Sequence, residues 1–216
     1  MITIARAAFV VAAGMPVVLA ASPYKVDTRD DVVASVRTMA HDLVSYYKGN
    51  QTGQVPGLLP GPPPSGPYYW WHGAVFWSTL IDYWHLTGDD SYNKIITEAL
   101  LWQGAGTTDT SSFLPLNQTA SLGNDDQCTW ALAALLAAEN RFPDPPNQAA
   151  GWVKAAQNVF EQQYARYQME VEKGDCEAGG LRWQIPLINT GYDYKNSEYL
   201  PLDEQTVWLM RSLSHV

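Results

Sequence analysis

Residues 70–90 read WWHGAVFWSTLIDYWHLTGDD, and apolar side chains occupy nearly every side of the helix that this stretch would form. A helix of that composition is buried all round. The neighbouring segments differ, because residues 28–47 and 91–103 repeat apolar residues at helical spacing along one face only. Thr28 and Asp31 start the first of these segments in a capping-box pattern. The sequence therefore predicts a buried helix between two half-exposed ones.

The alternation continues toward the C-terminus. Residues 130–138 are apolar all round, and residues 148–167 place Trp152, Ala156 and Tyr164 on one stripe. A double ring of helices needs such alternation, because its inner helices are enclosed while its outer helices show one face to water. We therefore predict an all-α fold of the α/α-toroid type. A helical-repeat solenoid is the alternative, although no motif recurs at a fixed period.

Charge and aromatic content narrow the classes of partner. The chain has 13 Lys and Arg against 22 Asp and Glu, a formal net charge of −9, which argues against a nucleic-acid partner. No Lys/Arg cluster suits an anionic membrane surface. The chain has 9 Trp and 12 Tyr, and that many Trp residues exceeds what packing usually requires. Carbohydrate-binding clefts use such flat apolar rings as platforms for sugar faces. A large core would use some of these rings too.

Cysteine and histidine usage predicts no metal site and no cofactor. The four histidines are scattered, and the sequence contains no CxxC pattern. Cys128 and Cys176 could pair in an oxidising compartment, but sequence does not establish the distance between them.

The N-terminus has the pattern of a secretory signal peptide. Residues 1–20 read MITIARAAFVVAAGMPVVLA: a short segment with Arg6, an apolar run and small residues at its end. The run is too short for a membrane span, and an apolar N-terminal helix of the fold is the alternative. Residues 21–216 would form the mature domain. Asn50 and Asn117 each begin an N-x-T sequon, which fits a glycosylated, secreted protein.

Two adjacent acids precede the second buried helix. Residues 121–140 read SLGNDDQCTWALAALLAAEN. Asn124 could be the N-cap, with Asp125 and Asp126 favoured by the helix dipole. The helix opens into the middle of the fold, however, where two carboxylates cost desolvation unless they have a use. Neighbouring acids can hold carboxyl groups roughly 5 Å apart, as retaining glycosidases require, and their pKa values are then driven apart.

These residues carry a resemblance. GNDDQ before a Trp- and Ala-rich helix resembles the family 76 glycoside hydrolases, the endo-α-1,6-mannanases. The stretches YYKGNQTGQVPGLLPGPP, YYWWHGAVFWSTLIDYWHLTGD and CEAGGLRWQIPLINTGYDYKN extend the resemblance over about residues 28–197. It implies an (α/α)6 barrel and retaining hydrolysis of α-1,6-mannan in the fungal cell wall, or transglycosylation of a mannose-bearing anchor glycan. The first acid would be the nucleophile, Asp125, and the second the acid/base, Asp126.

The same resemblance implies where the substrate binds. Trp70 and Trp71 could stack on sugars, or pack inside an inner helix. Trp183 stands beside paired glycines that allow close backbone approach, or it is a core residue at a turn. Further candidates for contacts with mannose are Asn124, Asn189, Tyr192 and Asp193; for the last three, a polar surface loop is the alternative.

The resemblance stops after Asn196-Ser197, and the 19 or so residues that remain suit one short helix. We therefore expect about half of the family's ring. A second hypothesis follows: an inactive remnant that binds mannan through its aromatic residues, or a helical scaffold. The scaffold interpretation loses ground if the two aspartates and Trp71 share one cleft.

Overall fold

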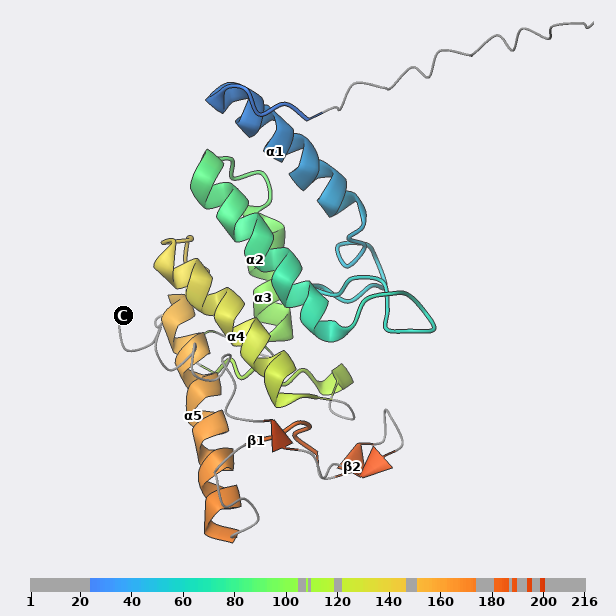
Figure 1. Ribbon diagram of the computed structural model, residues 1–216, viewed down its shortest axis with the longest axis vertical. Helices are drawn as coiled ribbons and strands as arrows, with labels where there is room; N and C mark the ends of the chain where they lie inside the picture. The colour runs from blue at the N-terminus through green and yellow to red at the C-terminus, as the bar shows by residue number, and fades with distance from the viewer. Residues whose placement is uncertain are drawn as a thin grey trace, which may run out of the picture. The chain divides into compact units, whose positions relative to one another are not determined.

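The computed structural model describes residues 24–104, 108, 110–118, 122–146, 151–173, 181–186, 188–189, 194–195 and 199–200. Helices dominate these residues (Figure 1). They are α1 (Arg29–Ser45), α2 (Trp70–Thr87), α3 (Asn93–Gln103), the 3-10 helix η1 (Leu116–Gln118), α4 (Asn124–Glu139) and α5 (Gly151–Lys173). Each of the five predicted α-helices is present, and the all-α prediction is confirmed. The predicted signal peptide lies outside the described residues.

Short antiparallel strand pairs follow α5. Strand β1 (Leu181–Arg182) pairs with β4 (Tyr199–Leu200), and β2 (Ile188–Asn189) pairs with β3 (Tyr194–Lys195). Each strand has two residues, so the pairs fix the path of the chain without adding a sheet layer. Among the helices that the structure describes, none has both the length and the apolar composition needed to cross a membrane.

The chain divides into two compact units, Met1–Ser35 and Val36–Val216. In the first unit, Thr28 Oγ1 accepts the Asp31 N–H over 3.1 Å and donates to the Asp31 carboxylate over 2.8 Å. These bonds confirm the predicted start of α1. Ser35 Oγ accepts the Lys25 N–H and donates to the Lys25 carbonyl, both over 2.8 Å, which ties the incoming chain to the helix.

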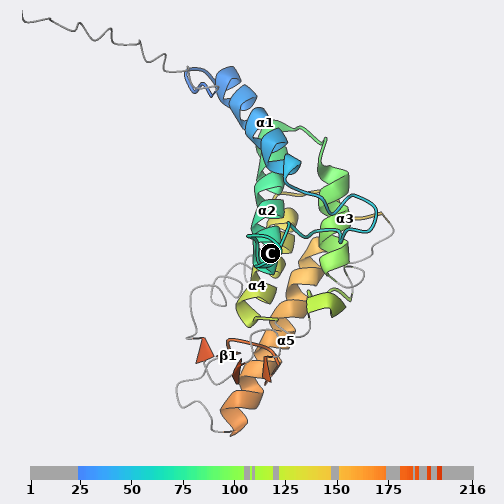
Figure 2. The same ribbon diagram turned by 90° about the vertical axis from the view of Figure 1, so that its right-hand side faces the viewer.

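The core of the second unit is built around α4, which packs between α2 and α5 (Figure 1), while α3 packs against α2 (Figure 2). Trp77 and Trp130 are fully buried at its centre. Alanines cover much of α4, so its neighbours approach closely: Ala131, Ala133, Ala134 and Ala137 have no exposed surface. The loop between α1 and α2 is tied down at Gly57, whose carbonyl accepts the Trp77 Nε1–H over 3.0 Å.

The prediction that α2 and α4 are buried on every side is wrong for one stripe of each helix. On α2, Trp71 and Val75 are 39% and 46% exposed. Val75 faces the partly buried Thr129 and Leu132 of α4 across an open groove of about 390 Å³. An apolar pattern does not reveal which side of an inner helix lacks a neighbouring element.

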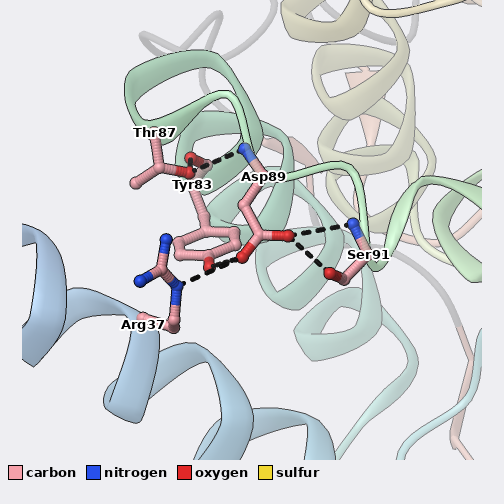
Figure 3. A network of polar contacts seen from close by, with 5 residues as sticks. All are labelled: Arg37, Tyr83, Thr87, Asp89 and Ser91. Carbon is pink, nitrogen blue, oxygen red and sulfur yellow. Dashed lines mark hydrogen bonds and ion pairs between the residues drawn. The ribbon is translucent and has the colours of Figure 1, made fainter.

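A polar network closes the turn between α2 and α3 (Figure 3). Gly88 ends α2 with φ 73°, a left-handed conformation that favours glycine. Asp89 then accepts hydrogen bonds from the Tyr83 hydroxyl over 2.5 Å and from the Ser91 N–H over 3.1 Å. Arg37 of α1 completes the network, with its Nε 3.4 Å from Asp89 Oδ2. The network joins α1 to the α2–α3 turn.

Candidate active site

The two predicted catalytic acids lie in the first turn of α4. Gly123 is the N-cap, with φ −90° and ψ 149°, so the expectation that Asn124 takes this position is wrong by one residue. A Cβ at Gly123 would lie 2.3 Å from Asp125 Oδ1 and 3.0 Å from Asp126 Oδ2. Both carboxyl groups therefore fold back over the same backbone position. These two oxygens are therefore no more than about 5.3 Å apart, which is compatible with the separation of about 5–5.5 Å in retaining glycosidases.

Asp126 has the electrostatic character of an acid catalyst. Burial, and then the charge of Asp125, raise the pKa of Asp126 to about 7, while a hydrogen bond from the Gly123 backbone opposes the rise. The burial of a carboxyl group disfavours its charged form. Asp126 therefore keeps its proton between about pH 4 and 7, where an ordinary aspartic acid is ionised.

Asp125 is surrounded by donors instead. Its Oδ1 accepts the Asp126 N–H over 2.9 Å, and its Oδ2 accepts the Trp183 Nε1–H over 3.2 Å. Hydrogen bonds of this kind favour a charged carboxylate. The bond to the Asp126 N–H also satisfies one of the open donors in the first turn of the helix, so Asp125 stabilises the helix start without being its N-cap.

The acids open into a pocket of about 320 Å³. Its wall is formed by Pro62, Tyr69, Trp70, Trp71, Gln118, Asp125, Asp126, Trp183 and Gln184. Five separate segments of the chain thus meet at the pair. Because Asp125, Asp126 and Trp71 share this pocket, the arrangement favours a catalytic or sugar-binding cleft over a helical scaffold.

The two tryptophans at the start of α2 have different surroundings. Trp70 is 8% exposed, donates its Nε1–H to Gln103 Oε1 over 2.8 Å and stacks on Trp130, so it is mainly a core residue with an edge in the pocket. Trp71 is 39% exposed and lies parallel to the His72 ring, with centroids 3.7 Å apart. Of these two tryptophans, Trp71 is therefore the one with exposed surface to stack on a sugar.

The segment after β1 reaches the pair through backbone bonds. The Asn124 N–H donates to the Trp183 carbonyl over 2.9 Å, and the Ile185 N–H donates to the Leu122 carbonyl over 2.9 Å. These bonds bring the Trp183 indole to Asp125 and place Gln184 in the pocket wall. Residues nearly sixty positions apart in the chain therefore form one site.

The structure does not place the other residues predicted to contact mannose in the pocket wall. Asn124 is 3% exposed, and its side chain bonds the Arg182 carbonyl and Arg166, so it lies in the framework beside the pair rather than in the pocket wall. Asn189 is described in its backbone only, where it pairs with Tyr194. Tyr192, Asp193 and Cys176 lie outside the described residues. Cys128 is buried within α4.

Sequence reasoning missed four residues of the pocket wall: Pro62, Tyr69, Gln118 and Gln184. Tyr69 had a signal, since it directly precedes the two tryptophans. Gln118 lies in η1 inside the second sequon, a motif that indicates only its asparagine as functional. Gln184 lies opposite Gly123 in an isolated antiparallel bridge, a long-range contact without a local sequence signal. Within the described ranges, no group of three or more His, Cys, Asp or Glu side chains could hold a metal ion.

Comparison with known proteins gives one consistent family. Residues 31–198 match the sequence profile of glycosyl hydrolase family 76. The chain is 42% identical over 159 residues to mannan endo-1,6-alpha-mannosidase DCW1 of Candida glabrata, covering 74% of this chain and 33% of that protein. It is 39% identical over 171 residues to the protein of that name in Saccharomyces cerevisiae, covering 79% of this chain and 35% of that protein.

A solved structure agrees with the fold. The crystal structure of Dfg5 from Chaetomium thermophilum in complex with glucosamine is 46% identical in sequence, with a TM-score of 0.74. The match covers 89% of this chain and 45% of that one. The chain spans about a third of the length of the two curated relatives described above.

Proposed function

The chain belongs to glycosyl hydrolase family 76, and from this premise we propose that it is a retaining glycosidase in which Asp125 is the nucleophile and Asp126 the acid/base. One observation carries the proposal: two carboxyl groups fold over Gly123 and face one pocket, where Asp125 accepts two hydrogen bonds and burial raises the pKa of Asp126. Retaining glycosidases need such a pair, one charged group to attack and one protonated group to donate.

The proposed reaction has two steps. Asp125 attacks the anomeric carbon while Asp126 gives its proton to the departing glycosidic oxygen, which leaves a covalent glycosyl ester on Asp125. Asp126, now ionised, takes a proton from a water molecule, and the oxygen of that water displaces Asp125 from the anomeric carbon. A sugar hydroxyl in place of the water gives transglycosylation. The configuration at the anomeric carbon is retained in either case.

The proposed substrate is α-1,6-linked mannan or a mannose-bearing anchor glycan. The curated relatives are named mannan endo-1,6-alpha-mannosidases, and the solved relative is described in complex with an amino sugar. The exposed face of Trp71, beside the acids, suits the apolar face of a sugar ring. Trp183 holds Asp125 and lines the same pocket, so it would lie close to the sugar that reacts.

The proposed location is extracellular, at the fungal cell wall. Residues 1–20 read as a signal peptide, and the matched relatives are fungal proteins named for mannan. The two sequon asparagines, Asn50 and Asn117, are both exposed, as N-glycosylation requires. The partner is then a polysaccharide, and the protein itself a glycoprotein.

The experiment that tests the function is cleavage of linear α-1,6-mannan by the full chain, compared with Asp125→Asn and Asp126→Asn. Asp90→Asn is the matched control, because it removes an exposed carboxyl group from a second aspartate pair outside the pocket. We expect cleavage by the parent and the control, with loss in both site variants.

A folded parent that binds mannan without cleaving it would contradict the enzyme and favour a non-catalytic mannan-binding protein. If Asp125→Asn and Asp126→Asn both cleave mannan as well as the parent does, the reaction does not depend on these two acids. Product analysis at early times, with and without added mannose oligomers, separates hydrolysis from transfer.

A further inference from the structure

The first four residues of α4 form two pairs: the inner pair in sequence is Asp125 and Asp126, and the outer pair is the flanking Asn124 and Gln127. Asp125 and Asp126 line the pocket, whereas Asn124 and Gln127 on either side of them are 3% and 0% exposed. Buried amide groups require hydrogen-bond partners, and those of the outer pair come from outside α4. Whatever holds the outer pair therefore also holds the turn that carries the two acids.

Arg166 of α5 contacts both members of the outer pair. Its Nε–H donates to Asn124 Oδ1 over 2.9 Å, and its Nη2 donates to Gln127 Oε1. A guanidinium is planar with donors in fixed directions, so it holds two acceptors in a set geometry. Burial lowers the pKa of Arg166 to about 10, which leaves the group charged at neutral pH. Hydrogen bonds from a charged donor are the stronger kind.

The amide nitrogens of the outer pair are held by other elements. Asn124 Nδ2 donates to the Arg182 carbonyl over 2.7 Å, and Gln127 Nε2 donates to the Ser112 carbonyl over 2.6 Å. Each amide is thus fixed at both ends, with Arg166 at the oxygen end of both. Without Arg166, two buried oxygens would need new donors, and the first turn of α4 would shift or admit water.

We propose that Arg166 is a positioning residue for the Asp125–Asp126 pair: by holding Asn124 and Gln127 it sets the direction in which the two carboxyl groups enter the pocket. The proposal rests on the proposed function, because positioning matters only if the pair reacts. A displacement of about 1 Å in reacting groups can cost about 100-fold in rate. A guanidinium that contacts no substrate can therefore have a large effect on turnover.

Removal of Arg166 can change the pKa of Asp126 in two opposite directions, through its charge or through its packing. The charged or titratable side chains around the pair and Arg166, in the part of the chain described, are Tyr69 in the pocket wall, His72 against Trp71, and the Arg182–Glu170 ion pair, 3.0 Å apart. The ion pair and Arg166 line a separate cavity of about 190 Å³. Loss of the Arg166 charge by itself would raise the pKa of a nearby carboxyl group, whereas loss of its packing would admit water and lower it.

The test compares four forms of the full chain: the parent, Arg166→Met, Arg166→Lys and Val159→Ala. Val159 is a fully buried apolar residue of the same helix, so its truncation is a control for general destabilisation. The measurements are kcat and KM on α-1,6-mannan, the melting temperature, and the pKa of Asp126 from NMR titration of carboxyl-labelled protein.

We expect Arg166→Met to lower kcat about 100-fold with little change in KM, and to lower the pKa of Asp126. Arg166→Lys should lower kcat and the pKa of Asp126 by less than Arg166→Met does, because lysine keeps the positive charge but lacks the planar set of guanidinium donors. Val159→Ala should lower the melting temperature and leave the pKa of Asp126 at the parent value.

An unchanged or raised pKa of Asp126 in Arg166→Met would overturn the proposal, as would kcat losses no larger than those of Val159→Ala. If the parent does not cleave mannan, the proposed function fails, but the NMR comparison still decides whether Arg166 sets the geometry of the pair. If Arg166→Met does not fold, Arg166→Lys provides the same test: a lowered pKa supports the proposal, and an unchanged one overturns it.

Discussion

Two of the chain's three adjacent aspartate pairs lie near a glycine and look alike in sequence, but their surroundings differ. Asp89–Asp90 follows Gly88 at the end of α2, and Asp125–Asp126 follows Gly123-Asn124 at the start of α4. Both pairs lie at a helix terminus beside a glycine. What separates them is the supply of hydrogen-bond donors and water around each carboxyl group.

Asp89 is surrounded by donors (Figure 3). Hydrogen bonds from Ser91 and Tyr83, with a contribution from Arg37, hold the pKa of Asp89 well below its usual range. Its carboxylate remains charged and ties the α2–α3 turn to α1. Asp126 is buried next to another acid instead, and its pKa rises to about 7. The first environment keeps a carboxylate charged, and the second favours a protonated carboxyl group, as the proposed acid/base role of Asp126 requires.

The largest expected difference is in activity. Asp125→Asn should lower kcat on α-1,6-mannan by about 10⁴-fold or more, the scale seen when a covalent nucleophile is removed. Asp89→Asn should leave kcat close to the parent value and lower the melting temperature, because it weakens a structural network. Comparable kcat losses in the two variants would break the comparison.

The two glycines should also differ. Gly123→Ala places a Cβ 2.3 Å from Asp125 Oδ1, so the acids must move, and we expect about a 100-fold loss of kcat. Gly88→Ala meets open space but has φ 73°, so it should lower the free energy of unfolding by about 1 kcal/mol and leave kcat unchanged. Kinetics and urea unfolding of both variants check this. A Gly123→Ala enzyme of normal kcat would contradict the close contact.

The pH dependence of activity should report Asp126. The acid must be protonated to donate, and its pKa is about 7, so kcat/KM should fall about tenfold per pH unit on the alkaline side. In Asp126→Asn the remaining activity, lower by about 10²- to 10⁴-fold, should lose this alkaline limb. Persistence of the limb in that variant would assign it to another group.

Local pattern was sufficient for much of the fold. Apolar periodicity located the five helices, and the capping signal at Thr28 located the start of α1. The apolar helix that directly follows the acid pair is the local feature that marks it in the sequence. Periodicity could not reveal the exposed stripe through Trp71 and Val75, because a stripe is exposed or covered according to its neighbours.

The rest of the site depends on distant contacts. Gln184 reaches Gly123 only through the fold, and Arg166 reaches Asn124 from the middle of α5. Sequence reasoning treated Asn124 as a cap and a substrate contact because such residues are common in both roles. Its actual partners lie about 40 and 60 residues further along the chain, beyond the reach of local spacing rules.

The smallest expected effects are on the free energy of unfolding. The contributions of Asp89 and Asp126 to it change in opposite directions as the pH rises. The lowered pKa of Asp89 means that its stabilisation, about 1–2 kcal/mol, is present above the unfolded pKa of about 3.9 and is lost as the pH falls toward the folded pKa. Asp126, with its raised pKa, keeps a proton in the folded state that the unfolded chain releases above about pH 3.9. Its contribution therefore becomes less favourable as the pH rises from about 4 to 7.

Urea unfolding at about pH 3, 5 and 7.5 separates the two effects. Relative to the parent, Asp89→Asn should lose stability at the two higher pH values and lose less at the lowest, because the unfolded parent chain then binds a proton that folded Asp89, with its lowered pKa, does not. Asp126→Asn should gain stability relative to the parent as the pH rises, because the amide has no charge to bury. Parallel profiles for the two variants would show that both pairs have the same environment, and the assignment of Asp126 as the acid would lose its physical basis.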